Sequence, residues 1–416
     1  MIRQKHVCIV GAGVIGACTA YALSREGWRV TLVDAALEPS QGVSKANGAQ
    51  LCYSHVEPLA SPDALRAMPS WLLASWLGRD SPVQWSPRLE WAHWRWLVSF
   101  VRHCRWQNVR QTTQELLELS LCSRRVMPEW IAQLPVSARE PLCYTQPGKL
   151  VIHRSQATRE RTGRQLAWQD RFDRTRRIVE ADECIKLEPA LGATGGGRIA
   201  FGVWNEKSDV IDAAKLSQAL AQASGATMIL GKPVTGFEIR NGRVQAVRLP
   251  DGNPLQADHF VVAAGPQSRA LMKLVGAETL IEPIKGGSIT LPVINEHAAP
   301  KVSMTDMGRK VAYARLGQHL RVVGFAELRG WNRSVDERCI NVLCRAVEAT
   351  FPGACSFNER APWAGLRPAT PSGRPVIGPM GLPNLWVNAG HGGLGLTLAA
   401  GSAMQLAKSM RSAGRE

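Results

Sequence analysis

The feature that most constrains this chain is the sequence Gly11-Ala-Gly-Val-Ile-Gly16, because it follows an apolar stretch and opens a helical one. The elements around it are predicted to be a strand, a helix and a second strand, over residues 6–10, 14–25 and 28–34. Gly11 permits a tight turn, Gly13 lets a pyrophosphate approach the backbone, and Gly16 lets the helix pack closely on the strand. The pattern therefore predicts a βαβ unit that binds the ADP half of a dinucleotide at the helix N-terminus.

The second predicted strand ends in an acidic residue, Asp34. At this position a carboxylate accepts hydrogen bonds from the adenosine ribose hydroxyls and repels a 2′-phosphate. NADP is therefore disfavoured. NAD and FAD both stay open at this point, because they contain the same ADP half.

Length and composition bound the class of protein. The 416 residues exceed the usual size of one domain, so two domains are expected. Hydrophobic residues make up 45% and charged residues 20%, which argues against a disordered or fibrous chain. The ten cysteines stand singly, without metal-ligand spacing, so neither a zinc nor an iron–sulfur site is predicted. A reducing compartment fits this cysteine usage, and the cytoplasm is the expected location.

The formal net charge of +16 admits two interpretations. It could draw the protein to anionic lipid, nucleic acid or a negatively charged substrate. We favour the simpler interpretation that the basic residues, densest between Arg154 and Arg177, form a solvated helix face. The arginines of this run are Arg159, Arg161, Arg164, Arg171, Arg174, Arg176 and Arg177.

From residue 58 to about residue 106 the composition shifts to Trp, Pro and Leu, which indicates the start of another domain. Half of the chain's 14 tryptophans fall in this region: Trp71, Trp76, Trp85, Trp91, Trp94, Trp96 and Trp106. Trp94, Leu97, Val98 and Val101 have helical spacing, and a helix with Trp beside Arg can lie on a membrane interface. The alternative, which we favour, is that these side chains pack against other helices or a sheet.

Further elements are predicted from hydrophobic periodicity and turn residues. The strongest turn signal is Asn241-Gly242, which divides residues 236–249 into a hairpin. Other strands are expected at 148–153 and 258–265 and around residues 228–230, 289, 311 and 322. Other helices are expected at 115–130, 213–224 and 337–349 and, after a Gly-rich turn, in the tail from 390 to 409.

Four groups of residues give the chain a resemblance to a known family. They are Val10 to Asp34; Ser44-Lys-Ala-Asn-Gly-Ala-Gln50; Val261-Val-Ala-Ala-Gly-Pro266; and Trp363-Ala-Gly-Leu-Arg-Pro-Ala-Thr-Pro-Ser-Gly-Arg-Pro-Val-Ile-Gly378 with Asn388-Ala-Gly-His-Gly-Gly-Leu-Gly395. On these residues the chain resembles the D-amino-acid oxidase superfamily of FAD-dependent oxidoreductases, and within it the small subunit of bacterial D-amino-acid dehydrogenases. Because the segments come from both ends and the middle, the resemblance covers most of the chain.

The resemblance implies an α/β fold in which a Rossmann-like FAD-binding domain is interleaved with an α+β substrate-binding domain. The second domain is expected to be built on a mixed or antiparallel sheet. The expected FAD-binding domain comprises residues 1–56, 177–275 and 361–416, and the substrate-binding domain comprises residues 57–176 and 276–360.

The reaction that the resemblance implies is FAD-dependent oxidative deamination of a D-amino acid. A hydride passes from Cα to flavin N5, and the resulting imine hydrolyses to a 2-oxo acid and ammonia. Oxidation of glycine, sarcosine or a cyclic imino acid of the D-proline type is the alternative. A flavin-dependent RNA-modifying protein and a non-catalytic FAD-binding subunit are further alternatives, although no RNA-binding motif is recognisable.

An electron acceptor is the second partner that the reaction requires, beside the small amino-acid substrate. The resemblance favours a membrane quinone or respiratory-chain carrier over dioxygen. Peripheral contact with the inner face of the plasma membrane is compatible with the basic, Trp-rich region, and a nucleic-acid partner is not expected.

The resemblance also assigns site residues. Arg367 is expected to hold the substrate carboxylate, because a guanidinium fork binds a planar carboxylate in a bidentate manner. His391 opens a loop whose N–H groups are expected to stabilise negative charge on the reduced flavin; a role for its ring as a general base is the less favoured interpretation. The expected FAD-binding residues are Gly11, Gly13, Val14, Ile15, Gly16, Asp34, Ala46, Asn47, Gly48, Ala49, Gln50, Ala264, Gly265, Gly390, Gly392, Gly393, Leu394 and Gly395.

One position departs from the family. The dehydrogenases usually carry a tyrosine in the segment occupied here by Lys285-Gly-Gly-Ser-Ile-Thr290, and this chain has Gly287 instead. The departure predicts a missing polar ligand and a widened or reshaped pocket, for which a bulky or cyclic substrate is one hypothesis. Lys285 is expected either near the pocket mouth or exposed on the surface.

Overall fold

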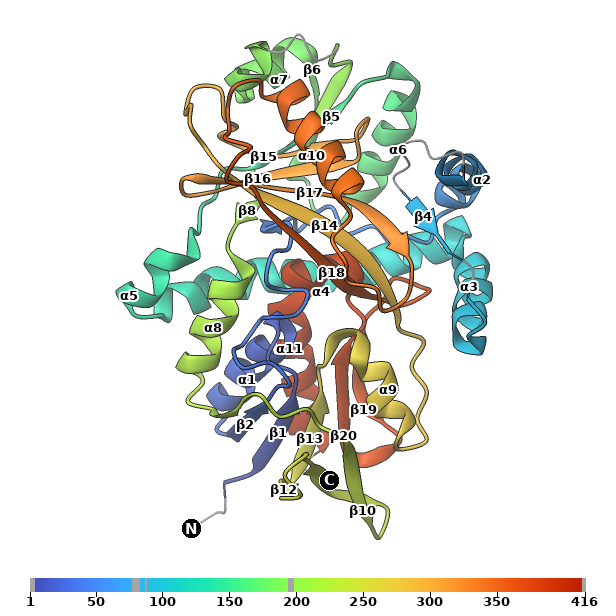
Figure 1. Cartoon of the computed structure of the whole chain (residues 1–416), viewed down its shortest axis with the longest axis vertical. Coiled ribbons are helices and arrows are strands. Elements are labelled where there is room, and N and C mark those ends of the chain that lie inside the picture. Colours follow the sequence, from blue (N-terminus) through green and yellow to red (C-terminus); the bar gives the residue numbers. More distant parts are fainter. Residues whose placement is uncertain (1–3, 77–82, 87, 194–197, 414–416) are drawn as a thin grey trace.

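The computed structural model describes residues 4–76, 83–86, 88–193 and 198–413. Figure 1 shows two layers of structure, one around a sheet in the lower half of the view and one around a second sheet in the upper half. The long helix α4 (Trp106–Gln133) crosses the molecule where these layers meet. The chain passes between the layers several times, so neither is built from one continuous segment.

The lower sheet has six strands in the order β19-β20-β13-β1-β2-β9. Their bounds are β1 (His6–Val10), β2 (Arg29–Val33), β9 (Thr227–Ile229), β13 (His259–Val262), β19 (Val376–Met380) and β20 (Leu382–Ala389). The five strands from β20 to β9 are parallel, and the edge strand β19 runs antiparallel to β20. Every residue of β1 is buried, as a parallel strand covered on both faces requires.

Helices cover one face of the lower sheet and a small sheet covers the other. On the first face lie α1 (Val14–Arg25), α8 (Ala213–Ala223) and α11 (Gly395–Ala413), packed through side chains such as Ala17, Leu216 and Ala403. On the second face lie β10 (Gly236–Arg240), β11 (Arg243–Arg248) and β12 (Leu255–Gln256). This layering leaves the carboxyl ends of the parallel strands open for a ligand.

The upper sheet has the order β18-β14-β17-β16-β15-β5-β7-β6, and the short strand β4 (Val83–Trp85) pairs with β17. The other bounds are β5 (Lys149–His153), β6 (Arg176–Glu180), β7 (Phe201–Asn205), β14 (Glu282–Pro292), β15 (Ser303–Asp306), β16 (Val311–Leu316), β17 (His319–Leu328) and β18 (Ala361–Ala369). Most of its pairings are antiparallel. Helix α10 (Glu337–Thr350) covers one face, where Leu343 and Val347 join the apolar core around Tyr313.

The remaining elements are short or peripheral. They are α2 (Pro62–Trp76), α3 (Trp91–His103), α5 (Val136–Arg139), α6 (Arg159–Gln169), α7 (Ala181–Leu187), α9 (Ser268–Lys273) and the strand pair β3 (Gln50–Leu51) and β8 (Asp209–Val210). Figure 1 shows α2, β4 and α3 together at one side of the molecule.

The predicted fold class and most predicted elements are confirmed. The strand, helix and strand around the Gly-rich turn are β1, α1 and β2, and the hairpin turn has positive φ at Asn241 (51°) and Gly242 (70°). Cys8 in β1 and Cys18 in α1 are fully buried. The fold is mixed α/β, and it contains one mainly parallel sheet and one mainly antiparallel sheet.

The prediction that the arginines between 154 and 177 form one solvated helix face is wrong. Three of them, Arg159, Arg161 and Arg164, lie on α6. Arg176 lies on β6 and is buried, because its guanidinium donates to Gln169 Oε1 and faces the carboxylate of Glu57. These two acceptors stabilise the buried guanidinium, and of the two only Glu57 comes from a distant part of the chain.

We expected Trp94, Leu97, Val98 and Val101 to pack against other helices or a sheet. This prediction is wrong for most of these side chains. Leu97 packs against the apolar cluster of Trp96 and Phe100, whereas Trp94, Val98 and Val101 are exposed. The buried side of α3 is thus formed mainly by residues other than the four that we chose from their helical spacing.

The division into two discontinuous domains remains a prediction. Strands β6, β7 and β18 are hydrogen-bonded into the upper sheet. The segments 177–205 and 361–369, which the resemblance assigned to the FAD-binding domain, therefore contribute strands to the sheet of the other domain.

Candidate active site

A cleft of about 710 Å³ runs along the carboxyl ends of β1, β2, β13 and β20 and reaches β18 of the upper sheet. The neighbours of β1 lie on either side of it, β2 on one side and β13 on the other, so the cleft opens where the strand order of the sheet reverses. Of the predicted site residues, those that line it are Gly11, Gly13, Val14, Ile15, Asp34, Ala264, Gly265, Gly390, His391, Gly392 and Gly395.

Asp34 stands at one end of the cleft, directly after β2. Its Oδ2 accepts a hydrogen bond from Ala12 N (2.6 Å) and its Oδ1 accepts one from Ala36 N (2.8 Å). These bonds fix the carboxylate at the wall of the cleft. Each oxygen keeps a further lone pair, which a ribose hydroxyl could use.

The Gly-rich turn brings three backbone segments too close together for side chains. Gly11 has φ +111°, and a Cβ there would lie 2.5 Å from Ala263 O. A Cβ at Gly16 would collide with Gly11 O. Gly16 therefore holds α1 against the turn and does not itself line the cleft.

The N-terminus of α1 is open toward the cleft. Gly13 occupies the N-cap position and provides no side-chain hydrogen bond. Val14 N donates to Ser44 Oγ (3.1 Å), and Ser44 also lines the cleft. The N–H groups that such a helix end leaves free favour an anion, and a pyrophosphate fits this position.

His391 lies at the other end of the cleft, in the turn after β20. Its ring is buried, and neither Nδ1 nor Nε2 has a hydrogen-bond partner within the part of the chain that the structure describes. Burial lowers the pKa of His391 to about 3, so the ring is neutral near pH 7. The nearby Asn388 has an unpartnered Oδ1, although its Nδ2 donates to Thr19 Oγ1 (3.0 Å).

Buried polar atoms without partners are rare in folded proteins, because each of them costs free energy. Two such residues at one end of a long cleft indicate that a polar ligand completes their hydrogen bonding. The cleft combines an anion-binding helix end, a ribose-binding carboxylate and this second polar end, and FAD fits that combination.

Arg367 lies on β18, outside the lining of the large cleft but next to its loop end. A Cβ on Gly393 would lie 3.9 Å from Arg367 Cδ, and the guanidinium occupies the space over Gly286 of β14. Its Nη1 donates to Phe325 O (3.2 Å), and no carboxylate pairs with the guanidinium among the described residues. Burial lowers the pKa of Arg367 from its ordinary value. A half-buried cation without an acid favours an anionic ligand.

Residues 46–50 approach the upper sheet and do not line the cleft. Ala46 O accepts from Ser288 Oγ (2.8 Å), and Asn47 O accepts from Arg321 Nη1 (3.0 Å). The Gln50 side chain is used within the protein: Nε2 donates to Met304 O and Tyr313 O, and Oε1 accepts from Lys149 Nζ (2.7 Å). Any contact of this segment with a cofactor would therefore come chiefly from its backbone.

Two predicted residues of the C-terminal loop, Gly393 and Leu394, are likewise absent from the cleft wall. Leu394 packs with Leu398 and Leu117 in an apolar cluster. Gly393 and Leu394 therefore contribute to a site through the conformation of the loop.

The absence of a side chain at Gly287 does not widen the pocket, although the loss of the tyrosine that the family usually carries in this segment suggested that it would. The ring of Phe325 already occupies the position that a side chain at residue 287 would take. The hypothesis of a pocket widened at this point is wrong, because the neighbouring strand fills it.

Lys285 is neither exposed nor at the cleft mouth. Its side chain is buried, pairs with Glu327 Oε2 (2.9 Å) and donates to Ser334 O (3.2 Å). Both positions expected for Lys285 are wrong, since the partner carboxylate lies on β17 and could not be identified from local sequence.

Several residues that line the cleft were not predicted from the sequence. Lys232 and Arg333 add positive charge to the wall, and Trp363 adds an aromatic ring. Ser44 and Trp363 belong to the segments that resemble the family, so the resemblance could have identified them as site residues. Lys232 and Arg333 lie in loops without a recognisable motif. No cluster of His, Cys, Asp or Glu suited to a metal occurs in the described ranges.

Comparisons with known proteins agree with this geometry. A family model described as FAD dependent oxidoreductase matches residues 6–409. The chain is 39% identical to D-amino acid dehydrogenase 2 of Ralstonia nicotianae over 97% of this chain and 95% of the relative, and 38% identical to D-amino acid dehydrogenase 2 of Pseudomonas aeruginosa over 97% and 94%. A crystal structure of glycine oxidase from Bacillus cereus superimposes with a TM-score of 0.73 at 19% identity, over 99% of this chain and 96% of that one.

Proposed function

This chain belongs to the FAD dependent oxidoreductase family, and from that premise we propose that it oxidises D-amino acids to 2-oxo acids and ammonia. The chain is an oxidoreductase whose cofactor is FAD, and its family relatives over nearly the whole chain are D-amino acid dehydrogenases. The observation that carries the proposal is Arg367, a half-buried guanidinium without an acidic partner beside the loop end of the cleft.

Residues along the cleft would hold FAD. Asp34 would bind the adenosine ribose, the turn from Gly11 to Gly13 and the first N–H groups of α1 would bind the pyrophosphate, and the loop from Gly390 to Gly395 would meet the flavin end. The flavin, when bound, supplies the two-electron acceptor that the oxidation needs.

Arg367 would orient the substrate. A guanidinium with free N–H groups can hold a carboxylate through two parallel hydrogen bonds, which fixes both the position and the plane of the amino acid. Phe325 O keeps one Nη in place without neutralising the charge. Orientation of this kind would present the Cα–H bond in one direction, which is one requirement for a preference between enantiomers.

His391 would act as a neutral hydrogen-bonding group. A ring with a pKa of about 3 is a poor proton acceptor, so a role as general base at pH 7 is disfavoured. One ring nitrogen can donate and the other can accept, which suits a polar ligand edge.

Electrons must pass from the enzyme to an acceptor, and we propose a membrane quinone or another respiratory-chain carrier. The net charge of +16 and the exposed tryptophans support an approach to an anionic membrane. Among the described residues no helix has the length and apolar character needed to cross a bilayer.

The proposal is tested by turnover assays on a panel of D-amino acids, L-amino acids, glycine and sarcosine, with an artificial electron acceptor. We expect D-amino acids to give 2-oxo acid and ammonia in equal amounts. Preferential turnover of an L-amino acid would contradict the stereochemical part of the proposal.

The second candidate is an oxidase or dehydrogenase for glycine, sarcosine or a cyclic imino acid. The fold that this chain shares with a glycine oxidase supports this candidate. Release of hydrogen peroxide with glycine or sarcosine, at a rate above that with D-amino acids, would favour it.

A further inference from the structure

Lys149 on β5 is a buried cation that contacts a thiol. It is one of two buried lysines in the described residues, and the other, Lys285, pairs with the carboxylate of Glu327. Lys149 is 6% exposed, and within the described part of the chain its Nζ donates to Gln50 Oε1 (2.7 Å) and Cys52 Sγ (2.9 Å) but pairs with no carboxylate. A buried ammonium without a negative partner costs free energy. The thiol is therefore the group that can compensate this charge.

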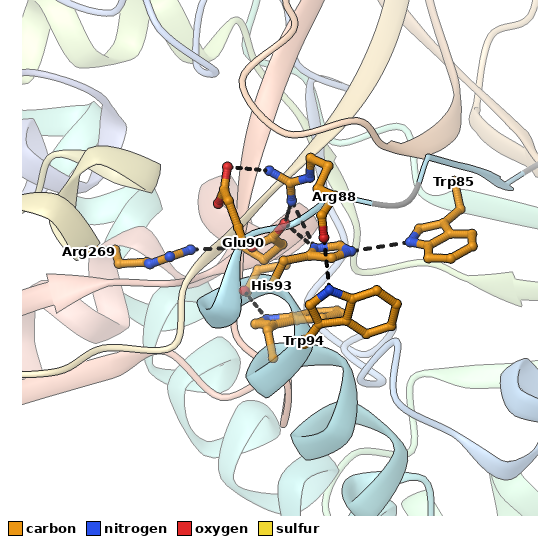
Figure 2. A network of polar contacts seen from close by, with 9 residues as sticks. Trp85, Arg88, Glu90, His93, Trp94 and Arg269 are labelled. Carbon is orange, nitrogen blue, oxygen red and sulfur yellow. Dashed lines mark hydrogen bonds and ion pairs between the residues drawn. The ribbon is translucent and has the colours of Figure 1, made fainter.

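A second network in the interior shows a paired arrangement for comparison. Figure 2 shows Arg88 and Arg269 in this network, where both guanidinium groups reach the carboxylate of the fully buried Glu282. His93 Nδ1 lies 2.8 Å from the same carboxylate. Buried positive charge is balanced there by an acid, whereas Lys149 has only an amide oxygen and a thiol.

The surroundings of Lys149 add positive charge. Burial, together with the charges of Arg176 and Lys149, holds the pKa of His55 well below its ordinary value. The buried carboxylate of Asp209, on the strand paired with β3, is occupied by two tyrosine hydroxyls at 3.2 and 3.0 Å. A negative charge on Cys52 Sγ would be stabilised in this setting, and the thiolate is the form of cysteine that reacts with oxidants.

Other buried cysteines lack this setting. Burial raises the pKa of Cys8 to about 12 and that of Cys355 to about 11. Among the described residues, no lysine lies within hydrogen-bond distance of either thiol, whereas Cys52 has Lys149 at 2.9 Å. Thiols buried in apolar surroundings are inert. Cys52 is thus distinguished by the amine beside it.

We propose that Cys52 and Lys149 form a reversible covalent bridge, Sγ–O–Nζ, when the protein meets hydrogen peroxide. The thiolate attacks one peroxide molecule to give a sulfenic acid, and the hydroxide that leaves takes a proton from the ammonium and becomes water. A second peroxide molecule takes two electrons from the amine as the N–O bond forms, and two more water molecules leave. In total sulfur and nitrogen each lose two electrons, two peroxide molecules yield three water molecules, and one oxygen atom stays between Sγ and Nζ.

The geometry favours an oxygen bridge over a direct bond. A direct S–N bond would need the two atoms to come far closer than 2.9 Å, whereas a single oxygen atom between them spans a separation of this order. A reduced flavin that meets dioxygen can supply the peroxide. Gln50, the other acceptor of Lys149, belongs to the segment expected beside the flavin. The bridge would therefore connect oxidant at the cofactor to the anchoring of that segment on β5.

The test is peptide mapping by mass spectrometry of the FAD-loaded protein after treatment with hydrogen peroxide. We expect one linked pair of peptides that contain Cys52 and Lys149, with the summed mass of the two less two hydrogen atoms and plus one oxygen atom. Dithiothreitol should return the separate peptides. Cys52→Ser and Lys149→Arg should each lose the linked pair completely, and their flavin absorbance reports folding. The wild-type map is decisive by itself if a variant loses its flavin.

The matched control is Cys355→Ser, which removes a buried thiol without a neighbouring amine and should keep the linked pair. The inference is overturned if peroxide leaves the two peptides separate, oxidises Cys52 only to a sulfinic or sulfonic acid, or links the peptides without the added oxygen. A linked pair that persists in Cys52→Ser would overturn it as well. The map needs no amino-acid substrate, so its outcome does not depend on the proposed function.

Discussion

At the scale of single residues, Arg367 has the clearest assignment, because its charge has no acidic partner among the described residues. Arg367→Ala is expected to raise the amino-acid concentration for half-maximal flavin reduction by roughly 100-fold, since a bidentate charge-assisted pair is lost. The FAD content should not change. Rapid-mixing absorbance under anaerobic conditions measures both.

The matched control is Arg374→Ala. Arg374 Nη1 already pairs with both carboxylate oxygens of Glu115 at 2.8 Å, so its loss should leave the substrate dependence unchanged. An equal shift in both variants would mean that the effect of Arg367 is a general loss of structure.

His391 makes a prediction about pH. Its pKa is lowered to about 3 in the folded protein from a value of 6.5, so the unfolded chain binds the proton more tightly in this window. The free energy of unfolding therefore falls as pH drops below about 6.5. Between pH 7 and pH 5 the contribution of His391 to this loss is about 2 kcal/mol.

Urea unfolding of the apoprotein at the two pH values measures this loss. The variant His391→Gln should lose less stability than the wild type over the same interval. Other histidines, such as the half-buried His153 with a pKa lowered to about 4, contribute equally to both proteins and cancel in the comparison. An identical pH dependence in wild type and variant would contradict the assigned environment of His391.

At the scale of elements, the turn between β1 and α1 determines whether the cleft can bind FAD. Gly11→Ala places a methyl group against Ala263 O at a positive φ. We expect a loss of unfolding free energy of about 2–4 kcal/mol and loss of bound FAD. Gly42→Ala is the control, because Gly42 also lines the cleft but has open space around it. FAD content per chain and urea unfolding distinguish the two, and equal behaviour would refute the proposed role of the turn.

The pairing of β14 with β17 depends on a buried ion pair. Lys285 and Glu327 are both fully or almost fully buried beside the irregular register between Lys285 and Gly287. Glu327→Gln leaves the ammonium without its carboxylate and is expected to cost about 3–5 kcal/mol of unfolding free energy. The double variant Lys285→Met, Glu327→Leu should recover much of this loss in urea unfolding. A double variant as unstable as the single one would show that packing, not charge, dominates there.

At the scale of the whole molecule, the sequence predicted the parts that depend on local pattern. The unit β1-α1-β2 and the hairpin at Asn241 follow from glycine spacing and periodicity within a few residues. The strand order of the upper sheet does not, because β14 pairs with β18 and β5 with β15 across long stretches of chain. The same reason explains the site: Asp34 was predictable from its place after β2, whereas the partner of Lys285 lies on a strand that is distant in the sequence.

The central claim is that a carboxylate held by Arg367 lies in front of a flavin bound along the cleft. The most direct measurement is the absorbance of the bound flavin during anaerobic mixing with the two enantiomers of one amino acid. We predict that the D-enantiomer bleaches the flavin within the mixing experiment and that the L-enantiomer leaves it oxidised. A protein that purifies colourless and takes up no flavin, or whose flavin stays oxidised with every amino acid offered, would contradict the account.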